Sequence, residues 1–266
     1  MQVTIVHACL RDGRGGSPTA VMEEAPLTDA ERRRVPALAG TSHAVFVSAP
    51  EAALRFFTTE GELPACGHGT IAALAFLAEA QVHRTTLRTS RRTFTGRADQ
   101  EKDHITASFD AGPVDLREPT AAELDLVLPA LGAGVLTHGA RVAAMGRPRL
   151  LIPVATRAAL SALAPDFERL RAACDELGLL GCYVYSAPEH SGRVAARMFA
   201  PSIGVPEDVA NANSTACLAA HLAGQGITVD MGDSLGSPAT ITAATRPGPT
   251  VVLGGTARIA RTFQLP

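Results

Sequence analysis

The sequence predicts an α+β protein with two similar domains, each a sheet wrapped around a central helix. A pattern of arginine, phenylalanine and proline occurs twice at one constant offset, at Arg55, Phe57 and Pro64 and again at Arg197, Phe199 and Pro206. Such a repeat favours duplication. Residues 70–80 are apolar on all sides, which predicts a buried helix inside a curved sheet. Short alternating segments predict antiparallel strands.

In the first half, β-branched and alternating residues predict strands at residues 3–9, 19–22, 42–47, 53–58, 85–90, 92–97 and 104–109. We expect His43 to be the first residue of its strand. Thr28 and Glu31 form a capping-box pattern, which predicts a helix to about residue 38. Residues 11–18 are rich in glycine but lack the ending of a phosphate-binding loop, so they predict a turn.

The second half repeats this order after a predicted link at residues 112–119. Its patterns predict helices at residues 120–131, 157–163 and 166–177, and strands at 181–186, 193–199 and 250–253. Residues 256–263 alternate and are expected to cross back to the first domain. These boundaries give an N-terminal domain of residues 1–115, a C-terminal domain of residues 116–255, and a closing strand at 256–266 that packs on the first.

Composition excludes several classes of function. The 266 residues carry a formal charge of −2 and no basic run longer than the three arginines at 32–34, which argues against a nucleic-acid partner. No apolar stretch approaches the length of a membrane span, and no leader pattern opens the chain, so we expect a cytoplasmic protein. The five cysteines are widely spaced without a C-x-x-C pair, which indicates neither a disulfide framework nor a zinc site.

The loop that opens the first apolar helix carries a thiol and an imidazole, at Cys66 and His68. A helix start has unpaired N–H groups and about half a positive charge, so it favours an anionic ligand and ionisation of a thiol. Gly67 and Gly69 leave the backbone open to a ligand. Cys66 is a candidate acid or base, or else a small buried side chain. His68 could bind a substrate carboxylate or carbonyl, shuttle a proton, or cap its own helix.

The corresponding loop of the second half has an acidic pair that ends in Asp208. A carboxylate there is stabilised by the helix start even without a catalytic role. The following residues supply hydrogen-bond groups for a substrate, at Asn211, Asn213, Ser214 and Thr215. We expect Ser214 or Thr215 to be the N-cap. Asn211 corresponds to Cys66 in the repeat and cannot exchange a proton, which disfavours a mechanism with two thiols.

With these loops, the sequence resembles the phenazine-biosynthesis isomerase-like (PhzF-like) family of the diaminopimelate epimerase and proline racemase superfamily. The likeness covers nearly the whole chain and includes the stretches ELPACGHGT, PEDV and GGTARI. It implies a diaminopimelate epimerase-like fold of two pseudo-symmetric domains, with the active site between them. It also implies that the site needs no organic cofactor and no metal, and that the protein is a homodimer.

The resemblance also implies roles for individual residues. The family's principal proton shuttle is a glutamate just ahead of a Phe-Val strand, and His43 stands in that place. Asp208 matches the aspartate of the family's Glu-Asp pair, and His68 matches its Gly-His histidine. The catalytic candidates are therefore His43, Cys66 and Asp208. The substrate-binding candidates are Gly67, His68, Gly69, Asn211, Asn213, Ser214 and Thr215, although the family has Thr-Gly-Ser where this chain has residues 211–213.

Together these features predict an isomerase that moves a proton, and with it a double bond, in a small unsaturated carboxylic or amino acid of natural-product biosynthesis. The carboxylate of this substrate would lie between the two helix starts, with His43 as the base and Cys66 or Asp208 as its partner. Two alternatives stay open. One is a cofactor-independent racemase or epimerase acting at a Cα, and the other is a binding protein for small acids that has lost catalysis.

Overall fold

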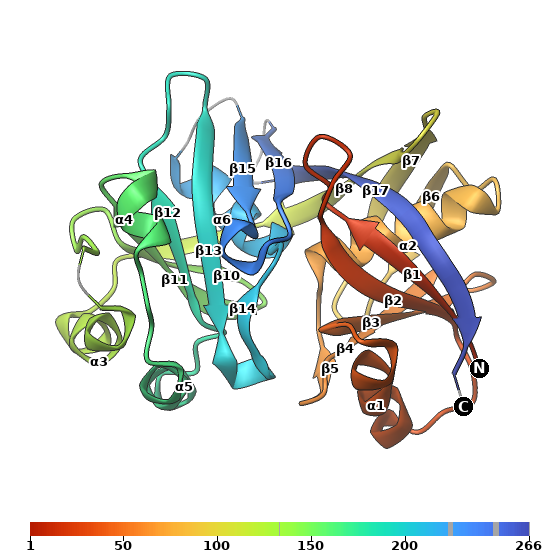
Figure 1. Ribbon diagram of the computed structural model, residues 1–266, viewed down its shortest axis with the longest axis horizontal. Coiled ribbons are helices and arrows are strands. Elements are labelled where there is room, and N and C mark those ends of the chain that lie inside the picture. The colour runs from red at the N-terminus through yellow and green to blue at the C-terminus, as the bar shows by residue number, and fades with distance from the viewer. Residues whose placement is uncertain (133, 223–225, 247–249, 266) are drawn as a thin grey trace.

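The computed structural model describes residues 1–132, 134–222, 226–246 and 250–265. The chain forms two lobes side by side (Figure 1). The first lobe holds helices α1 (Asp29–Ala39) and α2 (Gly67–Glu79). Its strands are β1 (Gln2–Ala8), β2 (Ser17–Glu23), β3 (His43–Ser48), β4 (Ala53–Phe57), β5 (Glu62–Leu63), β6 (Arg84–Arg88), β7 (Thr93–Gln100) and β8 (Ile105–Pro113).

The second lobe holds helices α3 (Ala121–Leu131), α4 (Arg157–Ser161), α5 (Phe167–Glu176) and α6 (Ala212–Leu222). Its strands are β9 (Asp115–Arg117), β10 (Arg141–Met145), β11 (Arg147–Val154), β12 (Cys182–Ser186), β13 (Arg193–Ala200), β14 (Val205–Asp208), β15 (Ile227–Met231) and β16 (Ala239–Thr245). The last strand, β17 (Thr250–Gln264), belongs to both lobes. Short 3-10 turns lie at Pro201–Ile203 and Asp233–Leu235.

Helix α2 is the core of the first lobe. Eleven of its thirteen residues are buried, as expected for a helix without a polar face. It contacts β1, β2, β3, β4, β7, β8 and β17, so the strands surround it on most sides. At Gly96 of β7 an added Cβ would lie 2.7 Å from a methyl group of Leu74, because strand and helix touch there. The sequence prediction of a buried helix in a curved sheet fits this lobe.

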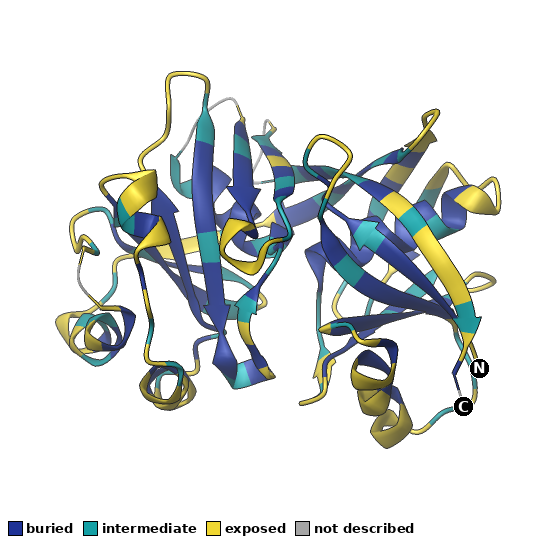
Figure 2. Cartoon of the chain, in the orientation of Figure 1, coloured by how far each residue is buried: buried dark blue, intermediate teal, exposed yellow. Residues whose placement is uncertain are grey.

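The second lobe has two apolar layers. Helix α6 contacts β10, β16 and β17 and contributes to the same core cluster as α2. On the other face of β11–β13, helices α3, α4 and α5 pack over a separate cluster that includes Leu150, Ile152 and Val184. Figure 2 shows these outer helices, and α1 of the first lobe, with one buried side and one exposed side. The structure is thus α+β, with helices inside and outside the sheet.

The last strand joins the lobes. β17 pairs with β16 of the second lobe and then with β8 and β1 of the first (Figure 1). The sequence predicted two separate segments, at 250–253 and 256–263, but they form one strand. Gly254 and Gly255 keep the pairing with Ser108 and Ala107 of β8. At Gly255 an added Cβ would lie 3.1 Å from Ile71 of α2, which explains the absence of a side chain there.

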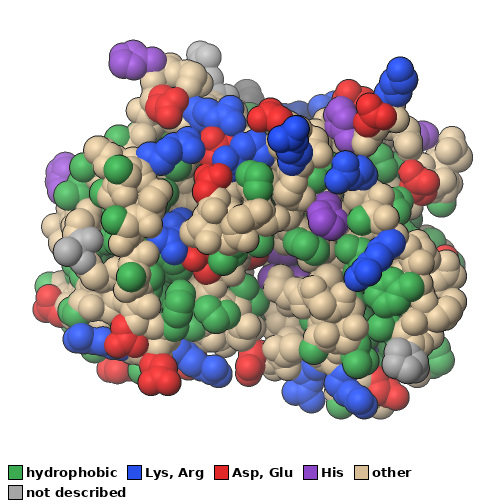
Figure 3. Space-filling model, viewed as in Figure 1, with side chains coloured by type: hydrophobic (Ala, Val, Ile, Leu, Met, Phe, Trp, Pro, Cys, Tyr) green, Lys and Arg blue, Asp and Glu red, His purple; other side chains and the backbone are tan. Residues whose placement is uncertain are grey.

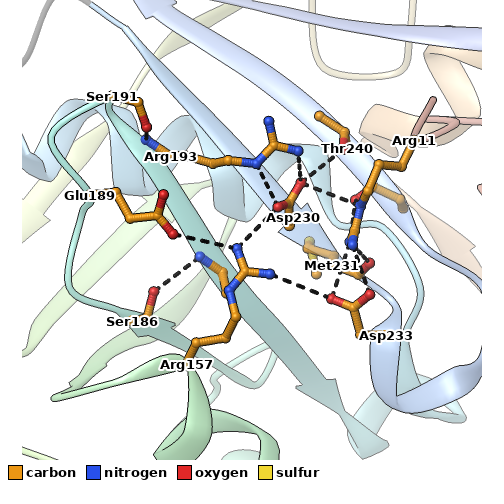
Figure 4. Close-up of polar contacts among 12 residues, drawn as sticks. Arg11, Arg157, Ser186, Glu189, Ser191, Arg193, Asp230, Met231, Asp233 and Thr240 are labelled. Atoms are coloured by element: carbon orange, nitrogen blue, oxygen red, sulfur yellow. Dashed lines mark hydrogen bonds and ion pairs between the residues drawn. The ribbon is translucent and has the colours of Figure 1, made fainter.

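A cluster of arginines and aspartates also joins the lobes (Figure 4). Arg11, from the first lobe, donates hydrogen bonds to the carbonyl of Met231 at 2.7 Å and to Asp233 at 2.7 Å. Its Nε lies 3.4 Å from Oδ1 of the buried Asp230. Asp230 also accepts from Arg193 at 2.7 and 2.8 Å. Burial acts to raise the pKa of Asp230, but the arginines outweigh it and lower that pKa.

The repeated arginines have the same surroundings in both lobes. Arg55 lies 5.0 Å from the ring centre of Phe57 and pairs with Glu62. Arg197 lies 4.8 Å from the ring centre of Phe199 and pairs with Glu207 at 2.8 Å. Each arginine therefore holds a short strand, β5 or β14, against its neighbour just before the loop that opens the buried helix.

Several other boundaries agree with the sequence prediction. Thr28 and Glu31 make both hydrogen bonds of a capping box at the start of α1. The predicted link at residues 112–119 instead contains β9, which pairs with β10. The strands at β10, β11, β15 and β16 were not predicted. Among the described residues, no helix has the length and apolar character needed to cross a membrane.

Candidate active site

The starts of α2 and α6 meet at the junction of the lobes. Cys66 is the N-cap of α2, and Gly67 is its first helical residue. A Cβ added at Gly67 would lie 2.5 Å from the Cβ of Ala212 and 3.0 Å from Oδ1 of Asn213. Since real Cβ atoms do not approach so closely, a glycine is needed where the two helices touch. The two N-termini, with their partial positive charges, thus lie together.

The start of α6 differs from the sequence prediction. The backbone N–H of Ser214 donates to Oδ1 of Asn211 at 2.9 Å, so Asn211 is the N-cap. The helix therefore begins at Ala212, and the expectation that Ser214 or Thr215 caps it is wrong. Both hydroxyls have hydrogen-bond partners inside the protein. The hydroxyl of Thr215 lies 2.8 Å from the Tyr183 hydroxyl, and the hydroxyl of Ser214 donates to the sulfur of Met198 at 3.5 Å.

A pocket of about 270 Å³ opens beside the two helix starts. Residues of the loop between β4 and α2 line it on one side, and the β10–β11 hairpin lines it on the other. Histidine atoms are visible in the furrow between the lobes (Figure 3). Six predicted site residues line the pocket: His43, Cys66, Gly67, His68, Asn211 and Asn213. Four others lie outside its lining: Gly69, Asp208, Ser214 and Thr215.

Four titratable side chains gather at the inner end of this pocket, each at most 5 % exposed. The sulfur of Cys66 lies 3.5 Å from Nε2 of His68. Nδ1 of His68 lies 3.9 Å from a carboxylate oxygen of Asp208. The rings of His43 and His68 meet edge to face, with their centres 4.4 Å apart. The three predicted catalytic residues are thus brought together, with His68 in the middle.

The two histidines have opposite electrostatic environments. Burial lowers the pKa of His43 well below its usual value, and the charge of His68 adds to this effect. Burial also acts to lower the pKa of His68, but electrostatic interactions with Cys66 and Asp208, a hydrogen bond with Cys66 and a backbone hydrogen bond at Ala210 outweigh it. The pKa of His68 is therefore raised to about 9. Near neutral pH, His43 is neutral and His68 carries a proton.

Asp208 lies beside the His68 ring and is itself held by hydrogen bonds. Burial raises the pKa of its carboxyl group, while the charge of His68 and a hydrogen bond from Asn211 act to lower it. The Asn211 amide donates to Asp208 Oδ2 at 3.0 Å, and the Ala210 N–H lies 3.4 Å from Oδ1. The preceding residue, Glu207, pairs with Arg197 and does not line the pocket. The acidic pair therefore divides into one structural residue and one site residue.

His43 is oriented by the residue before it. The hydroxyl of Ser42 lies 2.9 Å from Nδ1 of His43 and so orients the imidazole ring. Nε2 is then the nitrogen that can exchange a proton with a substrate. The β3 strand places His43 beside β2, opposite Thr19. Sequence reasoning did not single out Ser42, although a hydroxyl directly before a candidate base is a usable signal.

His43, Cys66 and His68 also have ligand atoms within 4.8 Å of one another. Two imidazoles and a thiolate are donor types that bind Zn²⁺. This set could hold a metal ion, so the sequence expectation of a metal-free site stays a prediction.

The pocket also contains residues that sequence reasoning missed. Arg149, Arg147 and Met145 line it from the β10–β11 hairpin, and Thr58 and Ser202 also line it. Arg149 is only 1 % exposed. A guanidinium so deeply buried beside a pocket is unusual.

Comparisons with known proteins identify the family of this chain. The family model for phenazine biosynthesis-like proteins, PhzC-PhzF, matches residues 9–259. The chain is 31 % identical over 248 residues to a trans-2,3-dihydro-3-hydroxyanthranilate isomerase of Pseudomonas aeruginosa, covering 88 % of this chain and 86 % of the other. It is 30 % identical over 232 residues to an uncharacterised isomerase of Deinococcus radiodurans, covering 80 % and 73 %.

Solved structures show the same fold. A PhzF-family phenazine biosynthesis protein of Bacillus anthracis superposes with a TM-score of 0.80 at 16 % identity, covering 99 % of this chain and 98 % of the other. A structure titled as a predicted epimerase of Pseudomonas aeruginosa gives a TM-score of 0.81 at 22 % identity, with the same coverage.

Proposed function

Because the chain belongs to the PhzC-PhzF family of phenazine biosynthesis-like proteins and is an isomerase, we propose that it shifts a proton in a small unsaturated carboxylic or amino acid, with migration of a double bond. Its family membership confirms the resemblance seen in the sequence. The trans-2,3-dihydro-3-hydroxyanthranilate named for its relatives is the first candidate substrate, and a role in natural-product biosynthesis follows from it.

The contrast between the two histidines is the observation that carries this proposal. A pair of titratable groups whose environments push their pKa values apart is the usual sign of an acid and a base. His43 is neutral and can remove a proton from an activated C–H group. His68 is protonated and can return a proton at another carbon. Their rings meet edge to face with centres 4.4 Å apart, which supports their acting together on one small substrate.

Cys66 and Asp208 would then act mainly through His68. Cys66 lies 3.5 Å from one nitrogen of its ring, and Asp208 lies 3.9 Å from the other. Their interactions with the ring raise the pKa of His68 to about 9, so the imidazole keeps the proton that a general acid requires. This changes the assignment made from the sequence, in which Cys66 or Asp208 was the direct partner of His43. We favour His68 because it lines the pocket, lies between Cys66 and Asp208, and has a pKa raised to about 9, so that it holds a proton to donate.

The remaining features are part of the same proposal. We infer that the reaction needs no organic cofactor and no metal. We also infer a duplicated architecture, with domains at residues 1–115 and 116–255 and a closing strand at 256–266. The protein is further proposed to be a homodimer with a cytoplasmic location. The contact of Gly67 with Ala212 supports the duplicated architecture, since these two residues follow Cys66 and Asn211, which correspond in the sequence repeat.

The proposal is tested by running the reaction in D₂O with trans-2,3-dihydro-3-hydroxyanthranilate, and then with a panel of other unsaturated amino acids, followed by NMR. We expect deuterium at the carbon that gains a proton, together with a displaced double bond. Absence of exchange with every acid, despite measurable binding, would contradict catalysis and favour a small-acid-binding protein.

A racemase or epimerase is the second candidate, because Cys66 is a thiol beside the protonated His68 at the pocket. A single thiol could exchange the proton of a Cα. In D₂O this reaction would place deuterium at the Cα and invert its configuration without moving a double bond. The same experiment therefore separates the two reactions.

The pH dependence of kcat/KM is expected to have an alkaline limb near pH 9. Activity falls as the pH rises through about 9 because His68 loses its proton there. The acidic limb should lie below 6.5, because the pKa of His43 is lowered from that usual value. Initial rates between pH 5 and 10.5 measure both limbs.

His68→Gln keeps a hydrogen-bond donor but cannot titrate. Its residual activity should show no alkaline limb near pH 9. If kcat/KM of this variant still falls near pH 9, as in the wild-type protein, then a group other than His68 is the acid.

A further inference from the structure

Arg149 lies where the alternation of its strand places a core side chain. Side chains at every second residue of a strand share a face. Leu151, two residues on, packs in the cluster that contains α6, whereas Leu150 and Ile152 pack in the outer cluster. Across the strand pair, Arg149 is opposite the fully buried Ala143. Its guanidinium is thus directed to the interior of the second lobe and not to solvent.

The contacts of this guanidinium are with neutral groups. Its Nη2 donates to the carbonyls of Arg147 at 2.7 Å and Met145 at 3.4 Å, and its Nη1 lies 3.5 Å from the hydroxyl of Ser214. Nε has no hydrogen-bond partner. Within the described part of the chain, Arg149 makes no ion pair. Burying a charge without an opposite charge costs free energy, so an arginine at this position points to a function other than stability.

Other buried arginines of this protein are paired with carboxylates. Arg32, which is 7 % exposed, contacts Glu24 and Asp29. Arg197, whose side chain is 11 % exposed, contacts Glu207. Arg149 is more deeply buried than either and has no such partner among the described residues. What distinguishes it is that it lines the pocket.

Arg149 and the acid–base group reach the pocket from different elements. Its contact with Ser214 places it beside the first turn of α6. Cys66 and His68 lie at the first turn of α2. Both helix starts favour negative charge, and Arg149 adds its own positive charge beside the first turn of α6. A bound molecule can therefore place an anionic group at α6 and a C–H group at His43 and His68.

We propose that Arg149 binds the carboxylate of the substrate and so selects acids over their neutral analogues. This inference rests on the proposed function and deepens it, because it places the carboxylate against α6 instead of midway between the helix starts. A guanidinium forms paired hydrogen bonds with a carboxylate. The apolar side chains of Met145, Leu180 and Ile203 line the same pocket and suit the carbon skeleton of a small acid.

The test is calorimetric titration with 3-hydroxyanthranilate, an aromatic analogue of the substrate named for the relatives, and with 3-hydroxyanthranilamide, which lacks the charge. The wild-type protein should bind the acid about 100-fold more tightly than the amide, since a charged hydrogen-bonded contact is lost. In Arg149→Met this preference should disappear. Arg149→Lys should keep part of it.

Arg141→Met is the matched control. Arg141 lies on the neighbouring strand β10, contacts Glu118 at 3.5 Å and does not line the pocket, so the preference should be unchanged. Arg149→Met removes an unpaired buried charge together with its hydrogen bonds to two carbonyls and Ser214, so its Tm is measured beside its binding. Should it fail to fold, the wild-type preference and the lysine variant still decide the question.

Several results would overturn the proposal. In the wild-type protein, these are equal binding of acid and amide, no binding of the acid, or binding of inorganic phosphate as tight as that of the acid. In Arg149→Met, it is a preference for the acid over the amide that persists. None of these depends on turnover. If acids bind through Arg149 but no proton exchange occurs in D₂O, the proposed reaction fails while the role of Arg149 stands.

Discussion

Replacing His43 by alanine is expected to lower kcat/KM by about 10²–10⁴-fold, the usual contribution of a positioned general base. His43 is the neutral member of the histidine pair and lines the pocket. The fold should persist, because the lost ring borders the pocket and makes one side-chain hydrogen bond, to Ser42, among the described residues. The measurement is the initial rate together with a circular dichroism spectrum and a Tm.

His83→Ala is the control, because His83 is exposed, hydrogen-bonds the carbonyl of Ala98 and lies outside the pocket. It should have wild-type activity. His43→Glu, which keeps a titratable base at this position, should recover part of the rate lost in His43→Ala. If His43→Ala keeps most of its activity, then His43 is not the base and the acid–base assignment fails.

Gly67→Ala is expected to reduce activity by about 100-fold and to lower the free energy of unfolding by about 1–3 kcal/mol. The new methyl group would lie 2.5 Å from the Cβ of Ala212, so α2 and α6 must move apart. Overpacking of this kind costs about 1–3 kcal/mol. A shift of about 1 Å in catalytic groups can cost about 100-fold in rate. Urea denaturation and initial rates measure the two effects.

Gly226→Ala serves as the comparison, because a Cβ there would make only ordinary contacts, the nearest being 3.5 Å from the carbonyl oxygen of Ala243. It should change neither activity nor stability by much. Wild-type activity in Gly67→Ala would mean that the spacing of the two helix starts does not matter for the reaction.

The parts of the fold that the sequence predicted are those with strong local signals. The capping box at Thr28 and the all-apolar run of α2 each determine a helix by short-range chemistry. The strands β10 and β11 lack such a signal. Pro148 and Pro153 lie within β11, and proline normally argues against an inner strand. Their pairing depends on long-range contacts with β12 and β9, which no local pattern contains.

The candidate site was partly predictable for a similar reason. Cys66 and His68 stand in one short motif at a helix start, and their proximity follows from that motif. The sequence offered His68 as a possible proton shuttle. Its raised pKa depends on Cys66 in the same motif but also on Asp208, which is 140 positions away in the chain, so the sequence alone could not single it out as the acid. Arg149 in a strand reads as a solvent-facing residue. Its burial depends on tertiary packing, in which α6 covers β10 and Ser214 of α6 contacts the guanidinium.

The path of β17 has a consequence for the way the molecule loses its structure. This strand shares backbone hydrogen bonds with β16 in one lobe and with β8 and β1 in the other. Neither lobe can melt without breaking the sheet of its neighbour, so heat should denature both in a single cooperative transition in a calorimeter. A chain that looks like two tandem units would then behave as one thermodynamic body.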